Sequence, residues 1–206
     1  MIDDKKARTI ERYRAQLQMH GNNYRALDWG SREGQLLRFQ ILCEIGNLAG
    51  SRVLDVGCGL GDLAAWLEER NLSVDYTGLE LTPELLAEAE RLHPSRRFIQ
   101  GSVLDPDVLA GESFDYVFAS GIFYSYPEDG DAWLEAAVTQ MWQWARIGLA
   151  FNTLSVWAEH PEPGEYYADP ARVLTFCHRL SPWVALRHDY HPRDFSIYMR
   201  RRSVAA

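Results

Sequence analysis

The residues best suited to chemistry in this sequence are three glycines that directly follow an apolar strand pattern. Gly57, Gly59 and Gly61 occupy alternate positions after residues 52–56, and a helical pattern begins at Asp62. Glycine lacks a Cβ atom, so such a turn lets the backbone approach a ligand closely, while the first turn of the following helix offers unpaired N–H groups. The pattern predicts a loop that cradles a small ligand.

A carboxylate ends the next predicted strand. Residues 74–79 form the second apolar run, and Glu80 follows them. In dinucleotide-binding folds an acid at this place accepts hydrogen bonds from ribose hydroxyls. The sequence after Gly59 lacks the third glycine of the dinucleotide fingerprint, and Asp62 at the helix start disfavours a phosphate there. We therefore expect a ligand that contains adenosine but no phosphates. A cationic group on that ligand, such as a sulfonium, would be tolerated next to Asp62.

The elements that must position these residues alternate along the chain. Short apolar runs separated by helical patterns are typical of parallel strands that are buried on both faces. The predicted strands are 52–56, 74–79, 97–99, 116–119, 147–151, 184–189 and 195–199, and the predicted helices are 62–69, 83–92, 131–145 and 170–180. Thr82 and Asp169 each precede a proline and are predicted N-caps. Residues 191–194 are too few for a helical crossover, so the last two strands must pair antiparallel.

Two more helical patterns precede the first strand. They cover residues 4–19 and about 33–47, and we expect them to form a cap. The whole pattern predicts an α/β fold: a Rossmann-like, seven-stranded, mostly parallel sheet with an antiparallel C-terminal hairpin, helices on both faces and an N-terminal helical cap. No linker or repeat divides the 206 residues. We expect a single domain, 1–206, with the cap in 1–49 and the sheet in 50–202.

The same residues carry a resemblance to a known family. Residues 53–61 resemble the first motif of class I S-adenosylmethionine-dependent methyltransferases, and Glu80 matches their ribose-binding acid. Residues 98–105 and 114–122 are similar to the third and fourth motifs. The resemblance extends over roughly residues 50–202 and implies S-adenosylmethionine as the cofactor. Ser102 departs from the family, which often has an aspartate there that reaches the adenine amino group.

The resemblance implies a cofactor site built from these motifs and from the start of the second helix. Asp55 either binds the amino group of the methionine part or holds the glycine loop by accepting its N–H groups, and we favour the second role. Trp29, Ser31 and Gln35 are expected to form a lid over the methionine part, although Trp29 could equally be a packing anchor. The predicted cofactor residues are Trp29, Ser31, Gln35, Asp55, Gly57, Cys58, Gly59, Gly61, Glu80, Leu81, Ser102, Val103, Leu104, Ser120, Gly121 and Ile122.

The methyl acceptor is expected beyond the carboxyl ends of the strands, where open α/β sheets bind ligands, in a pocket built from the loops after the fourth and fifth strands and from the N-terminal cap. Tyr124, Tyr126 and Asn152 lie in the loops that follow these strands and are the predicted substrate residues. The aromatic residues could equally seal the edge of the core. A hydroxyl or ammonium acceptor needs a base, and His178, His188, His191 and the tyrosines are candidates by residue type alone, so no catalytic base is predicted.

Composition excludes several classes of function. A net charge of −8 disfavours nucleic acid, since binding to phosphates depends on clustered Lys and Arg, and we interpret the basic run 200–202 as a solvated strand end. The 3 cysteines are widely spaced, so neither disulfides nor a metal site are expected. No apolar run is long enough for a membrane span, and residues 1–6 do not resemble a signal peptide. We expect a cytoplasmic protein.

The leading interpretation is therefore an enzyme that methylates a small molecule. Methyl transfer is an in-line displacement, so the enzyme contributes mainly by aligning the acceptor with the methyl group. Two alternatives remain open. The protein could use S-adenosylmethionine for other chemistry, such as intramolecular cyclisation or alkyl transfer, or it could be a non-catalytic protein that binds the cofactor. The sequence predicts neither the acceptor nor the oligomeric state.

Overall fold

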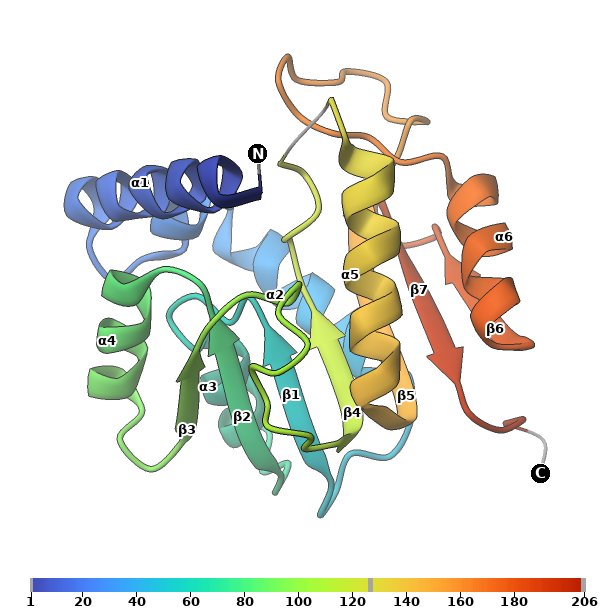
Figure 1. Ribbon diagram of the computed structural model, residues 1–206, viewed down its shortest axis with the longest axis horizontal. Coiled ribbons are helices and arrows are strands. Elements are labelled where there is room, and N and C mark those ends of the chain that lie inside the picture. Colours follow the sequence, from blue (N-terminus) through green and yellow to red (C-terminus); the bar gives the residue numbers. More distant parts are fainter. Residues whose placement is uncertain (1, 126–127, 205–206) are drawn as a thin grey trace.

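A computed structural model describes residues 2–125 and 128–204 (Figure 1). The strands are β1 (Arg52–Val56), β2 (Asp75–Glu80), β3 (Arg97–Gln100), β4 (Phe114–Ala119), β5 (Ala145–Leu154), β6 (Trp183–Arg187) and β7 (Asp194–Arg200). The helices are α1 (Ile2–His20), the 3₁₀ turn η1 (Tyr24–Leu27), α2 (Arg32–Cys43), α3 (Asp62–Glu69), α4 (Pro83–Leu92), α5 (Gly130–Trp144) and α6 (Pro170–Leu180). Each strand and helix predicted from residue 51 onward is present.

All strands join one seven-stranded sheet in the order β3-β2-β1-β4-β5-β7-β6. The five strands from β3 to β5 run parallel, and β7 lies antiparallel between β5 and β6. The order reverses between β1 and β4, because β2 and β3 extend the sheet on one side of β1 and β4 extends it on the other. This confirms the predicted Rossmann-like sheet with its antiparallel C-terminal hairpin. Ligands of open α/β sheets bind at such a reversal point.

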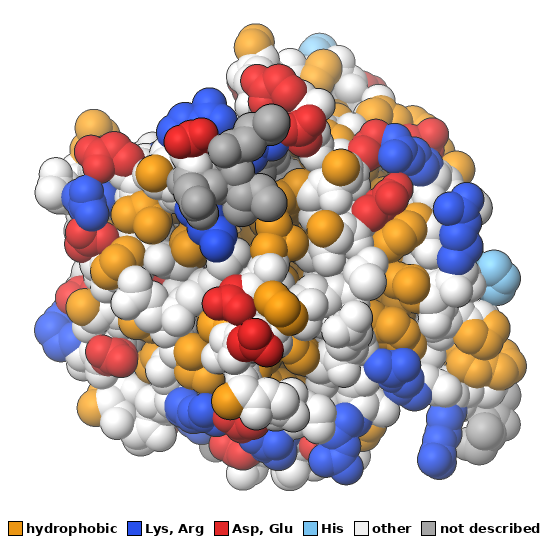
Figure 2. All heavy atoms as spheres, viewed as in Figure 1, with side chains coloured by type: hydrophobic (Ala, Val, Ile, Leu, Met, Phe, Trp, Pro, Cys, Tyr) orange, Lys and Arg blue, Asp and Glu red, His pale blue; other side chains and the backbone are white. Residues whose placement is uncertain are grey.

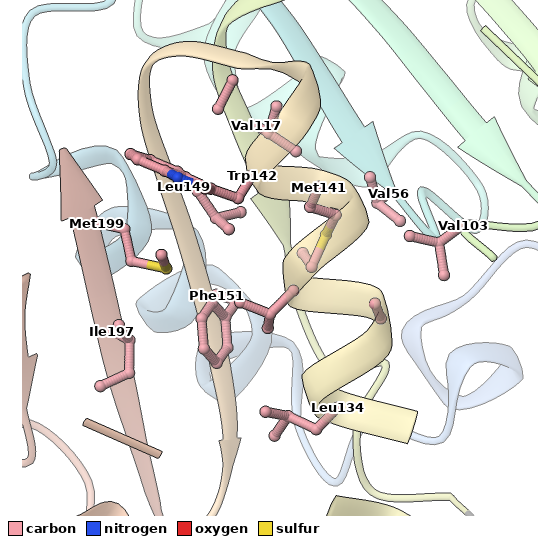
Figure 3. Packing of buried hydrophobic residues seen from close by; sticks show 14 of the residues in the cluster. Val56, Val103, Val117, Leu134, Met141, Trp142, Leu149, Phe151, Ile197 and Met199 are labelled. Atoms are coloured by element: carbon pink, nitrogen blue, oxygen red, sulfur yellow. The ribbon is translucent and has the colours of Figure 1, made fainter. Parts of the chain in front are cut away.

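The strands alternate their side chains between two separate cores. Leu54 and Val56 belong to the core under α5 and α6, whereas Val53 belongs to the core under α2 and α3. Figure 3 shows the first core, where Leu134 and Met141 of α5 pack near Leu149 and Phe151 of β5. Because successive strand residues point to opposite faces, a sheet covered by helices on both sides is apolar at almost every position.

The N-terminal region is divided between two roles. Helix α1 contacts η1 and α4 and lies across the end of the sheet toward which β2 and β4 point (Figure 1). Helix α2 packs instead against β5, β7 and α3, and it buries Phe39, Ile41 and Leu42 in the core on that face. The predicted cap is therefore formed by α1 and η1, and α2 is part of the helical layer on the sheet.

Some predicted boundaries were wrong. Helix α2 ends at Cys43 rather than near residue 47, and beyond it Gly46 passes so close to Tyr116 that a Cβ atom would lie 2.5 Å from the phenol oxygen. Strand β5 extends to Leu154 because it pairs with β7 along that length.

The two predicted helix caps have different outcomes. Asp169 caps α6 as predicted, since its carboxylate accepts the N–H of Ala171 at 2.9 Å. Thr82 precedes α4 but makes no side-chain cap bond. Its own main-chain N–H donates to Glu80, 2.7 Å away, and its side chain is fully buried.

Neither a membrane span nor a metal site was expected from the sequence. Within 2–125 and 128–204, no helix combines the length and apolar character that a bilayer crossing requires. Cys43, Cys58 and Cys177 are free thiols, and the described part of the chain contains no group of three His, Cys, Asp or Glu side chains placed to hold a metal ion.

Candidate functional site

A cavity of about 380 Å³ lies at the carboxyl ends of β1, β2 and β4, where the strand order reverses. Its walls come from the loops after these strands, from α1 and α2, and from the first turns of α5. The volume falls within the usual range for small-molecule sites, about 300–1,000 Å³. The glycine loop and Glu80 both contribute to its lining.

The glycine loop has a backbone that only glycine adopts readily. Gly57, Gly59 and Gly61 have φ angles of +70°, +56° and +78°. A Cβ atom at Gly57 would lie 2.4 Å from Cγ2 of Ile122, so the loop after β4 packs directly against the loop after β1. The N–H of Gly57 donates to the carbonyl of Leu79 at 2.7 Å and ties the turn to β2.

Glu80 holds the glycine loop from the neighbouring strand. Its two carboxylate oxygens accept the N–H of Gly59 at 3.0 Å and the N–H of Thr82 at 2.7 Å. The residue is only 6 % exposed. Burial raises the pKa of Glu80, and the backbone N–H groups oppose that shift because they favour the carboxylate. Glu80 thus makes the bond to a loop N–H that the sequence interpretation assigned to Asp55.

Asp55 lies inside the sheet at the floor of the cavity. Its carboxylate accepts the hydroxyl of Tyr76 at 2.8 Å, and it is 4 % exposed. Burial is the main reason that the pKa of Asp55 is raised to about 7, and the nearby Glu80 and Asp62 add to the shift. A cationic group in this cavity would favour the ionised form of Asp55.

Asp62 also lines the cavity but does not act alone. Its carboxylate accepts Nη1 of Arg32 at 2.7 Å and Nε2 of Gln35 at 2.8 Å. The sequence interpretation treated Asp62 as an isolated negative charge at the helix start. Arg32 offsets much of that charge, so Asp62 disfavours a phosphate less than expected.

Helix α1, which was expected as part of a cap, lines this first cavity with residues that the sequence analysis did not name. Lys5, Lys6, Thr9 and Tyr13 all line the cavity. The hydroxyl of Tyr13 lies 2.8 Å from that of Tyr124, and Lys5 forms an ion pair with Asp129 at the start of α5. The spacing of residues 5, 9 and 13 puts them on one face of a helix, which is the signal that could have identified this wall.

The structure brings together nearly all the predicted cofactor residues. The residues that line the cavity are Trp29, Gln35, Asp55, Gly57, Cys58, Gly59, Glu80, Leu81, Ser102, Val103, Leu104, Ser120, Gly121 and Ile122. Two do not line it. Ser31 caps α2 by accepting the N–H of Gly34 at 3.0 Å, and Gly61 faces His93, which a Cβ atom would approach to 2.7 Å.

A second cavity, of about 580 Å³, adjoins the first. Leu27, Trp29 and Gly121 line both cavities, so the two share a wall. Tyr124 and Asn152, predicted as substrate residues, lie here, and Tyr126 lies outside the described residues.

The predicted substrate residues are bonded to elements around both cavities. The side-chain oxygen of Asn152 accepts the N–H of Gly121 at 2.8 Å, which joins β5 to the loop after β4. The hydroxyl of Tyr124 donates to Asp28 at 2.7 Å.

The three candidate histidines lie in different places. His178 is exposed on α6. His188 stacks on Phe195, with ring centroids 6.0 Å apart, and is therefore a packing residue. His191 lines the second cavity, with its Nδ1 atom 2.6 Å from Asp194.

The first cavity fits S-adenosylmethionine in chemistry as well as in size. The buried carboxylates of Asp55 and Glu80 can accept hydrogen bonds from amino and hydroxyl groups. Trp29 and Tyr13 supply aromatic surface, which attracts a sulfonium. On the face of the molecule that Figures 1 and 2 share, Lys and Arg side chains are interspersed with Asp and Glu, without one large basic patch (Figure 2).

Comparison with known proteins gives consistent matches. Residues 53–146 match the model of a methyltransferase domain. A candidate methyltransferase of Mycobacterium tuberculosis is 33 % identical over 159 residues, which are 72 % of this chain and 92 % of that protein. The magnesium-protoporphyrin O-methyltransferase of Rhodobacter capsulatus is 37 % identical over 91 residues, but these are only 41 % of this chain and 38 % of that enzyme.

Solved structures share the fold over nearly the whole chain. The magnesium protoporphyrin IX methyltransferase of Synechocystis, with bound S-adenosylhomocysteine, aligns with a TM-score of 0.67 at 16 % identity and covers 97 % of both chains. The complex of DhpI with S-adenosylhomocysteine also has a TM-score of 0.67, at 18 % identity, and covers 95 % of this chain and 96 % of that one.

Proposed function

Because this chain belongs to the class I S-adenosylmethionine-dependent methyltransferases, we propose that it transfers the methyl group to a small organic molecule held in the second cavity. The observation that carries this proposal is the pair of adjoining cavities. The first contains the family's cofactor residues, and the second shares Trp29 and Gly121 with it. Two ligands can therefore lie side by side at the carboxyl end of the sheet.

Each wall of the first cavity has a distinct task. Glu80 accepts the ribose hydroxyls, Asp55 favours the positive end of the ligand, and α1 with Trp29 excludes water. When bound, S-adenosylmethionine supplies an electrophilic methyl group on a positively charged sulfur. The chain's own contribution is to align an acceptor with that group, which can supply several of the roughly 7–11 kcal/mol available from orientation.

The second cavity favours transfer to a second molecule over intramolecular cyclisation and over a purely binding role, and the family match favours a methyl group over another alkyl group as the group transferred. An intramolecular cyclisation of the cofactor needs no space for a second molecule, and a protein that only binds the cofactor needs none either. The Rhodobacter relative and the Synechocystis structure are named for magnesium protoporphyrin, which is a small molecule. These names support a small-molecule acceptor for this chain as well.

The test uses the full chain with S-adenosylmethionine and a mixture of small-molecule metabolites. Titration calorimetry should show saturable binding of both S-adenosylmethionine and S-adenosylhomocysteine. Mass spectrometry should show S-adenosylhomocysteine together with a product that is heavier by one methylene unit. Formation of methylthioadenosine would instead support cyclisation or alkyl transfer, and binding without turnover would support a non-catalytic role.

We also infer a cytoplasmic enzyme that folds as one domain over residues 1–206 and does not act on nucleic acid. The free thiols of Cys43, Cys58 and Cys177 suit a reducing compartment. The net charge of −8 opposes binding to a phosphate backbone.

A further inference from the structure

One end of the second cavity contains a buried charged network around Asp194. Arg38 donates to this carboxylate through Nε and Nη2, each at 2.8 Å, and Nδ1 of His191 lies 2.6 Å from it. The side-chain nitrogen of Asn152 lies 3.5 Å away and connects the network to the loop after β4. The side chain of Asp194 is 3 % exposed and that of His191 is 29 % exposed. The carboxylate is therefore fixed, while the imidazole faces the cavity.

The contact between His191 and Asp194 determines which ring nitrogen carries the hydrogen. A carboxylate only accepts hydrogen bonds, so a 2.6 Å contact requires the hydrogen on Nδ1. The main-chain N–H of Arg193 also points at Nδ1 as a donor, at 3.2 Å. The two contacts compete for Nδ1, and the shorter one, to a charged carboxylate, is the stronger. In the neutral ring the lone pair is then on Nε2. Burial and the charges of Arg38 and Arg193 lower the pKa of His191, against the opposing effect of Asp194, which favours this neutral form near pH 7.

The two arginines of this cavity differ in how completely they are paired. Arg38 is held by both oxygens of Asp194. Arg193 donates through Nη2 to Tyr167 at 2.9 Å and to Glu165 at 3.3 Å, but its Nε atom is buried and has no hydrogen-bond partner among the described residues. Arg38 is therefore occupied by Asp194, whereas Arg193 keeps one buried donor that an oxygen of the acceptor could satisfy.

The cavity also contains a buried hydroxyl that lacks a partner. Thr153 is 4 % exposed and lines the cavity, and among the described residues its Oγ1 atom has no hydrogen-bond partner. Buried polar groups are usually paired, and an unpaired one costs about 1–3 kcal/mol. A polar group of the ligand that donates or accepts a hydrogen bond would satisfy it.

We propose that the acceptor is a hydroxyl or amine compound and that His191, oriented by Asp194, is the general base that takes its proton. This rests on the proposed methyl transfer. The acceptor's O–H or N–H bond breaks, the proton goes to Nε2 of His191, and the acceptor's electron pair forms the bond to the methyl carbon. The carbon–sulfur bond breaks and its electron pair stays on the sulfur, which becomes neutral. The imidazolium then releases its proton to solvent.

The charged and titratable groups of this cavity and its network come from five described parts of the chain. They are Asp28 after η1, Glu33 and Arg38 of α2, Tyr124 of the loop after β4, Glu165 of the segment before α6, and Tyr190, Arg193 and Asp194 of the hairpin. Because the protonated ring cannot accept a proton, kcat/KM should fall as the pH falls through the lowered pKa of His191. The His191→Asn variant should lose that limb of the pH profile.

The first measurement needs no acceptor. Nitrogen-15 NMR of histidine-labelled protein, with His191 assigned through the His191→Asn variant, reports which ring nitrogen carries the hydrogen. We expect a neutral ring with the hydrogen on Nδ1 at pH 7.5, and we expect Asp194→Asn to lose this preference. A hydrogen on Nε2, or a charged ring at that pH, overturns the proposal because Nε2 would then have no free lone pair.

The second measurement follows S-adenosylhomocysteine formation with panels of alcohols, phenols, amines and carboxylic acids. Turnover should occur with hydroxyl or amine compounds, and His191→Asn should lower kcat about 100-fold or more while the affinity for S-adenosylmethionine stays unchanged. The exposed His178→Asn variant is the matched control and should keep wild-type kcat. Turnover of carboxylic acids alone, turnover of no compound, or full activity of His191→Asn overturns this inference. Failure to bind S-adenosylmethionine at all would instead overturn the proposed function.

Discussion

Replacing Glu80 by glutamine tests whether one carboxylate both fixes the glycine loop and binds the cofactor. In the wild-type protein its two oxygens accept the N–H groups of Gly59 and Thr82. A glutamine has one oxygen and one amino group, so one of these buried N–H groups would face another donor. An unsatisfied buried donor costs about 1–3 kcal/mol, and the free energy of unfolding of Glu80→Gln should fall by about that amount.

The cofactor affinity should fall as well, because a neutral amide replaces a charged acceptor for the ribose hydroxyls. A hydrogen bond to a charged group contributes about 1.5–3 kcal/mol. Since about 1.4 kcal/mol corresponds to a factor of ten in Kd, the Kd for S-adenosylmethionine should rise roughly 10- to 100-fold.

Two assays separate these effects. Urea denaturation of the ligand-free protein gives the change in the free energy of unfolding, and titration calorimetry gives the Kd for S-adenosylmethionine. The matched control is Glu90→Gln, also a glutamate to glutamine change, at an exposed position of α4. It should leave both quantities unchanged. A folded Glu80→Gln protein that binds S-adenosylmethionine with wild-type affinity would refute the assignment of Glu80.

Three further predictions test the loop, the cavity floor and the charged network. Gly57→Ala puts a Cβ atom 2.4 Å from a neighbouring side chain, and in calorimetry it should weaken S-adenosylmethionine binding at least about tenfold. The control Gly111→Ala has a similar φ of +78° and no atom within 4 Å of the new Cβ, so it should lose only about 1–2 kcal/mol of stability and keep its affinity. Burial raises the pKa of Asp55 to about 7 from 3.8, so its contribution to stability is present below pH 4 and is lost as the pH rises through 7. In urea denaturation at a series of pH values between 4 and 7, the free energy of unfolding should fall less steeply with pH for Asp55→Asn than for the wild-type protein. Identical slopes of unfolding free energy against pH would contradict the assignment. Arg38→Met leaves the buried Asp194 carboxylate without its main partner, and in urea denaturation it should lower the free energy of unfolding by about 3–5 kcal/mol. The control Arg91→Met removes an exposed ion pair and should cost less than about 1 kcal/mol. Equal losses would show that the buried pair has no special role.

The glycine loop could be predicted because its signals are local. Gly57, Gly59 and Gly61 are adjacent in sequence, and their positive φ angles are a property of the loop itself. Glu80 was predictable because the end of one parallel strand must lie beside the end of the next, which the pairing of β1 with β2 confirms. These features needed only the order of strands and the chemistry of single residues.

Gln35 of α2 was predicted to line the site and does so, but the separate places of α1 and α2 in the fold could not be predicted from the same kind of signal. Both helices have apolar residues at helical spacing, and such a pattern shows that a face is buried without showing what buries it. The polar face of α1 meets the ligand cavity through Lys5 and Tyr13, whereas α2 mainly covers the sheet and reaches the cavity only through Gln35 and Phe39 among the described residues. Only the tertiary packing distinguishes a wall of the site from a layer of the fold.

The charged network around Asp194 was hidden from the sequence for a topological reason. Arg38 and Asp194 are far apart along the chain, and His191 lies in a short connection that shows only that the last strands run antiparallel. That reversal is what creates the site. Because β7 runs opposite to β5, with Leu154 paired to Asp194, its first residue lies at the edge of the sheet where the parallel strands end. A parallel β7 would have put Asp194 at the other end of the sheet, away from both cavities, so the inverted strand is required both to complete the sheet and to bring a carboxylate and a histidine to the second cavity.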